Sequence, residues 1–150
     1  MLSHYWMMFL MILVSIWLAY YVNAVISLRK YTTDNLNKFY MAVFMGLQMG
    51  LIELLFFVLL LGGKITNVTI IIFITLVIGI VFIGYKLYTL DFMRDDEQFM
   101  LAMIEHHSMA LSMADKNQTQ NPRLKKIIAD IKASQEAQIK EMYDILQKNH

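Results

Sequence analysis

The side chains best suited to chemistry are methionines and histidines that gather in one short stretch of the chain. Thioether and imidazole groups together suit monovalent copper or silver, whereas zinc is less suited because thioethers are poor ligands for it. The chain has 13 methionines and no cysteine, so any soft-metal site must depend on these donors. The expected copper(I) or silver(I) ligands are Met100, Met103, His106, His107, Met109 and Met113, with Met142 arriving from a second helix.

The spacing of this stretch is that of one helical face. Met103 lies one turn before both His106 and His107, and Met109 and Met113 extend the side of His106. Such a face would capture a metal ion. The alternative is an ordinary amphipathic helix, in which the methionines fill a core and the histidines are partly exposed.

A second set of candidate residues lies inside an apolar run. Met41, Met45, Met49 and Glu53 recur at four-residue steps and would line a transmembrane path for a metal ion. A carboxylate within a membrane is costly and tends to face a cavity. The alternatives are plain packing of the methionines and a neutral Glu53 bonded to a neighbouring helix. His4, Met7, Met8 and Met11 share a face at the start of the preceding run.

Three apolar runs, 5–28, 39–61 and 65–90, must position the second set. A hydrocarbon core of ~30 Å needs ~20 helical residues, so each run is long enough to cross a bilayer. Helix is expected because an open strand leaves its backbone unsatisfied in lipid. Arg29, Lys30 and Lys38 follow the first run, which favours an outside amino terminus and a cytoplasmic carboxyl terminus.

The remaining segment, 91–150, is charged and amphipathic and predicts a helical hairpin. Its first helix ends near Lys116, and Asn121 and Pro122 are a good cap and first residue for the second. Two helices bury little core. We therefore expect a homo-oligomer in which a second hairpin completes a four-helix bundle. The predicted fold class is an all-α, multi-pass integral membrane protein.

The stretch from about Asp95 to Leu146 resembles the bacterial domain-of-unknown-function family numbered 305. The matching residues are Phe99, Met100, Met103, Ile104, His106, His107, Met113, Ala114, Gln135, Ile139 and Met142. The start of the second run, Tyr40-Met41-Ala42, resembles members with three N-terminal spans. The resemblance implies a ferritin-like bundle, copper or silver binding through Met and His, and a hairpin on the exported side. The sequence departs from that pattern at Glu105, Gln138 and Ile145, which stand for the usual Pro, Glu and Trp.

Other classes of function find no support in the sequence. A net charge of +1 gives no general attraction for nucleic acid. The sequence has no nucleophile elbow, phosphate loop, zincin helix or dinucleotide fingerprint, so an enzyme is not expected. A di-iron site would need inward-facing Glu-x-x-His pairs, which are absent before His106 and His107. Three hypotheses remain: a membrane-anchored metal binder, a metal channel or carrier, and a metal-free structural oligomer.

Overall fold

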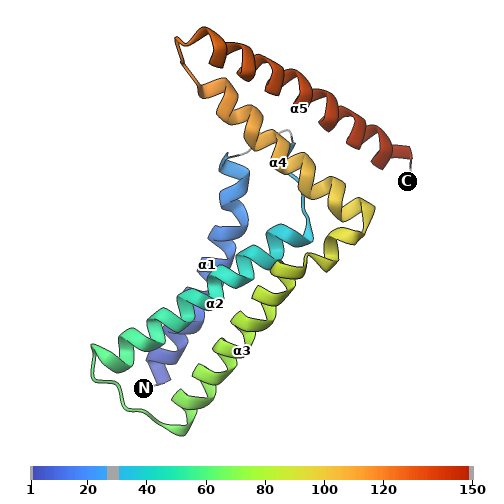
Figure 1. Ribbon diagram of the computed structural model, residues 1–150. Helices are drawn as coiled ribbons and strands as arrows, with labels where there is room; N and C mark the ends of the chain where they lie inside the picture. The colour runs from blue at the N-terminus through green and yellow to red at the C-terminus, as the bar shows by residue number, and fades with distance from the viewer. Residues whose placement is uncertain (1, 27–30, 149–150) are drawn as a thin grey trace. The chain divides into compact units, whose positions relative to one another are not determined.

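The chain is helical throughout the part that the structure describes. The computed structural model describes residues 2–26 and 31–148, which contain no strand. The elements in chain order are α1 (Leu2–Ile26), α2 (Leu36–Leu59), α3 (Asn67–Thr89), the short 3-10 helix η2 (Asp91–Arg94), α4 (Asp96–Lys116) and α5 (Pro122–Lys148) (Figure 1). The predicted all-α class is confirmed.

Three segments of this part of the chain are long and apolar enough to cross a membrane. They are His4–Val22, Leu36–Leu59 and Asn67–Arg94. The prediction of three such helices is therefore confirmed. Residues 27–28 of the first predicted run, the orienting Arg29 and Lys30, and residues 149–150 of the predicted hairpin lie outside the described residues. The orientation of the chain in the membrane accordingly stays a prediction.

Polar caps set the ends of the helices more sharply than hydropathy does. Asn35 Oδ1 accepts a hydrogen bond from the backbone N–H of Lys38 at 2.9 Å, so α2 begins three residues before the predicted run. Thr66 Oγ1 accepts from the backbone N–H of Thr69 at 3.2 Å and delays the start of α3 to Asn67. Asn121 Oδ1 accepts from two backbone N–H groups at the start of α5, which confirms it as the cap.

The contacts within the chain divide it into two compact units. One consists of Met1–Tyr21 with Phe39–Asp91, and the other of Val22–Lys38 with Phe92–His150. The second unit starts next to the boundary expected at residue 91. It also contains a segment from far upstream, which the predicted hairpin lacks.

Three helices contribute one side chain each to the core of the first unit. Met8 of α1, Leu54 of α2 and Leu76 of α3 are buried against one another. A hydrogen bond of 2.8 Å between the Tyr5 hydroxyl and the Thr69 hydroxyl ties α1 to the start of α3. Most other apolar side chains of this unit point outward, as expected of helices surrounded by lipid.

The core of the second unit lies between α4 and α5, which run antiparallel (Figure 1). Ile104 and Leu111 of α4 and Ile139 of α5 are almost fully buried. The upstream segment covers part of this core, because the ring of Tyr31 lies 6.2 Å from that of Tyr143. We expected a second hairpin to cover this core, but the upstream segment of the same chain covers part of it.

The buried face of α4 is distinct from its methionine-histidine face. It consists of Met100, Ile104, Glu105, Ser108, Leu111 and Ser112. Small serines let a neighbouring helix approach closely, and the Ser108 hydroxyl stays satisfied by donating to the carbonyl of Glu105 at 2.9 Å. Counting apolar residues along the sequence does not find this face, because half of its members are polar.

A buried ion pair joins the upstream segment to α4. Lys38 and Glu105 are only 3% and 5% exposed, and Lys38 Nζ lies 3.3 Å from Glu105 Oε1. Asn35 Nδ2 donates to the other carboxylate oxygen of Glu105 at 3.0 Å. Lys38 Nζ also donates to the Thr33 carbonyl, and the Thr33 hydroxyl donates to the Leu101 carbonyl at 2.7 Å. The carboxylate is thus compensated by the Lys38 ion pair at Oε1, which accepts no hydrogen bond within the described residues, and by the Asn35 hydrogen bond at Oε2.

We predict that Lys38→Met destabilises the protein by about 3–5 kcal/mol, because it leaves the Glu105 carboxylate buried without a counter-charge. Unfolding of the full chain in mixed micelles, followed by circular dichroism, measures the change. The double variant Lys38→Met/Glu105→Met should recover most of the loss.

Lys132→Met is the matched control, because it removes an exposed lysine whose Nζ lies 2.5 Å from Asp115 Oδ1. Equal effects of Lys38→Met and Lys132→Met would show that the buried pair does not hold the second unit together.

Candidate metal centre

The predicted ligands of the hairpin lie in three different environments. His106 and Met113 are exposed, Met103, His107 and Met109 are half-buried, and Met100 and Met142 are taken up by packing. Met142 belongs to the side chains packed against the Ile104–Leu111–Ile139 core. The donors that lie outside the packed core are therefore those of α4 from Met103 to Met113.

Of these α4 donors, Met103, His106 and His107 lie on the side of the helix that the described residues of the second unit leave open. The upstream segment bonds to Glu105, and α5 packs on Ile104 and Leu111. At 100° per residue, Met103 and His107 stand roughly 160° around the helix from Glu105. His106 occupies the same open arc, which is the face that the sequence spacing predicted.

The open face is too long for all of these donors to reach one ion. Met103 and Met113 are ten residues apart, a rise of about 15 Å along a helix. A single chain can therefore offer either Met103 with His107 and His106, or His106 with Met109 and Met113. The ligands expected on α4 therefore divide into these smaller groups.

His107 is the member of the open face with the clearest capacity to bind. Its Nδ1 is buried and has no hydrogen-bond partner within the described residues. Burial, with a smaller contribution from the neighbouring His106, lowers the pKa of the His107 imidazole. The two rings lie 6.2 Å apart. A neutral imidazole with an unused nitrogen is the form that ligates metal ions.

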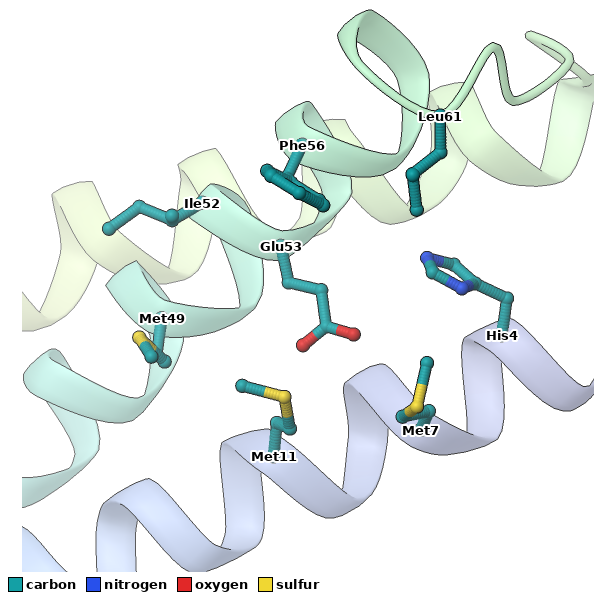
Figure 2. Close-up of a pocket in the computed structure, with 8 residues that line it drawn as sticks. All are labelled: His4, Met7, Met11, Met49, Ile52, Glu53, Phe56 and Leu61. Atoms are coloured by element: carbon teal, nitrogen blue, oxygen red, sulfur yellow. The ribbon is translucent and has the colours of Figure 1, made fainter.

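The structure gathers the donors of the membrane-spanning helices in a way that the sequence does not predict. A pocket of about 320 Å³ in the first unit is lined by His4, Met7, Met11, Met49, Ile52, Glu53, Phe56 and Leu61 (Figure 2). Two of the four predicted path residues, Met49 and Glu53, line it. The other two, Met41 and Met45, are exposed on α2 and do not line the pocket.

The two helices that line this pocket, α1 and α2, approach each other closely next to it. Gly46 and Gly50 stand one turn apart on α2, and Ile16 and Ile12 of α1 lie over them. A Cβ added to Gly50 would be 2.5 Å from Cδ1 of Ile12, and one added to Gly46 would overlap Cγ1 of Ile16. Small residues at this spacing let membrane helices meet closely. The Gly-x-x-x-Gly signal was present in the sequence and marks the face of α2 that another helix can approach, but it does not identify that helix as α1.

Neither set of donors suits a hard metal. Among residues 2–26 and 31–148, no three His, Asp or Glu side chains form a group that could hold a metal ion. Methionine thioethers are the other donors of both sets, and they suit monovalent copper or silver.

Comparison with known proteins places the chain in a family. Residues 86–150 match the family described as Domain of unknown function (DUF305). The chain is also 39% identical over 115 residues to Uncharacterized protein L153 of Acanthamoeba polyphaga mimivirus, a match covering 75% of this chain and 71% of that protein. No solved structure matches the chain. With its methionine-histidine helix α4 inside the matched region, the chain belongs to the DUF305 family.

Proposed function

We propose that this protein is a membrane-anchored binder of monovalent copper or silver that serves metal handling or resistance. The observation that carries the proposal is the half-buried His107. Its Nδ1 has no hydrogen-bond partner among residues 2–26 and 31–148, and Met103 lies one turn before it on the open face of α4. His106 adds a second imidazole next to this pair. Thioether and imidazole donors on a face without nearby carboxylates favour a soft monovalent ion.

A second copy of the hairpin would complete the site. Leu124, Ile127, Ile131 and Ile145 of α5 are exposed. Ile127, Ile131 and Ile145 stand roughly 120–160° around the helix from Tyr143, which faces the upstream segment. This apolar strip therefore lies on the same open side as the α4 donors. Packing two hairpins through these sides would form a four-helix bundle and bring donors of both copies together.

We predict that copper(I) binding by the full chain depends on Met103 and His107. In a titration against a competing chelator, Met103→Leu/His107→Ala should weaken the binding by at least about tenfold, since loss of second-shell groups alone costs that much in metal sites. Met142→Leu, a similar-sized change at a packed methionine, is the matched control and should leave the binding unchanged. Equal affinities for the two variants would refute the hairpin site.

The pH dependence of binding follows from the lowered pKa of His107. A protonated imidazole cannot ligate, and a lowered pKa keeps the ring neutral to a lower pH. We therefore predict that the part of the affinity that depends on His107 persists as pH falls through ~6.5, the ordinary histidine value, and is lost only below it. The same chelator competition, run from pH 8 to 5 beside His107→Ala, measures this. A wild-type affinity that stays flat over the whole range would count against histidine ligation.

The oligomer is tested separately. We predict that native mass spectrometry of the full chain in detergent detects a dimer or a larger assembly, and that Ile127→Lys/Ile131→Lys shifts it toward the monomer by placing charge in the apolar strip. Ala129→Lys/Ala133→Lys alters exposed positions on the other side of α5 and is the control. A wild-type protein that is monomeric throughout would contradict the shared site.

A further inference from the structure

The pocket of the first unit contains a separate set of ligand atoms from that of the hairpin. Figure 2 shows the imidazole of His4, the thioethers of Met7 and Met11 and the carboxylate of Glu53 directed toward one space between α1 and α2, with Met49 beside them. Each of the five stands three or four residues from the next donor on its own helix, so each helix presents its donors on one face.

Two polar atoms in this pocket have no partner in the described part of the chain. They are Nε2 of His4 and Oε2 of Glu53, and both are buried. An unsatisfied polar atom in apolar surroundings destabilises the fold, and native structures seldom retain one without a role. A bound cation in the pocket would satisfy such atoms, because each can donate a lone pair.

The surrounding residues hold the His4 ring in a defined plane. The ring stacks on Phe57, with centroids 3.9 Å apart and planes inclined by 27°.

The pocket lies close to an end of α2. Glu53 is six residues before the end of that helix at Leu59, a rise of about 9 Å. The pocket is therefore near one end of the spanning helices, where an ion from water can reach it at a lower cost than at the bilayer centre.

We propose that His4, Met7, Met11, Met49 and Glu53 form a second binding site, within the membrane-spanning helices, for a monovalent soft cation such as Ag⁺ or Cu⁺. Three thioethers and one imidazole select a soft ion. The single carboxylate balances one positive charge, which matches a monovalent ion better than a divalent one. This proposal does not depend on the hairpin site, because its ligands are all in the first unit.

The test uses the full chain in detergent with His106→Ala/His107→Ala, so that the hairpin histidines do not contribute. Ag⁺ is titrated against a competing ligand, and Met7→Leu/Met49→Leu is compared with Met41→Leu/Met45→Leu. The second pair is the matched control: it makes the same exchange at exposed methionines outside the pocket. Leucine nearly conserves the volume of methionine, and circular dichroism verifies that the helices are retained.

The proposal expects a tight Ag⁺ site in the His106→Ala/His107→Ala protein, weakened at least about tenfold by Met7→Leu/Met49→Leu and unchanged by Met41→Leu/Met45→Leu. X-ray absorption of the His106→Ala/His107→Ala protein loaded with Cu⁺ should show sulfur atoms and nitrogen or oxygen atoms bound to the ion. His4→Phe should remove the imidazole nitrogen from this set, while its ring keeps the stack on Phe57. No Ag⁺ binding in the His106→Ala/His107→Ala protein, or equal binding by the two methionine variants, would overturn it and leave an apolar pocket filled by lipid.

The outcomes for the two sites are separable. Ag⁺ binding that disappears with His106→Ala/His107→Ala supports the hairpin and overturns the pocket. Binding that survives those changes but is lost with Met7→Leu/Met49→Leu supports the pocket alone.

Discussion

The burial of one carboxylate decides how the second unit is built. Glu105 is on the inner face of α4, where an uncompensated charge would cost several kcal/mol. Lys38 and Asn35 reach it from a segment far upstream, and this fixes the segment against one side of α4. Since α5 covers a second side through Ile104 and Leu111, the remaining arc is the one with Met103, His106 and His107. The position of the candidate metal ligands thus follows from an ion pair that contains none of them.

Much of the fold was predictable because it depends on local patterns. Long apolar runs predict the spanning helices, and the Asn121-Pro122 pair marks the turn of the hairpin, since both signals act over neighbouring residues. The helix starts at Leu36 and Asn67 were missed by two or three residues because side-chain caps, rather than hydropathy, determine them. The pairing of Lys38 with Glu105 has no local signature: two charged residues in different segments show no sign of their contact in a single sequence.

The candidate sites were predictable to different extents for the same reason. Spacing along one helix correctly places Met103, His106 and His107 on one face, because helical geometry alone determines it. It gives no information on Met142, whose packing against the core depends on how α5 meets α4. In the first unit, spacing along α2 groups Met41 and Met45 with Met49 and Glu53, yet the approach of α1 at Gly46 and Gly50 selects only the last two. Contacts between helices, rather than periodicity within one, define that pocket.

The discontinuity of the second unit has a consequence for how the protein is made. The hydrogen bond from Asn35 to Glu105 joins residues 70 positions apart, and both α2 and α3 lie between them in the chain. During synthesis, the segment around Asn35 emerges long before its partner, and both intervening helices must be produced first. The ion pair between Lys38 and Glu105 therefore cannot form until those apolar helices have been synthesised. Completion of the second unit is a late event in biogenesis, and errors in inserting α2 or α3 would leave it without its upstream cover.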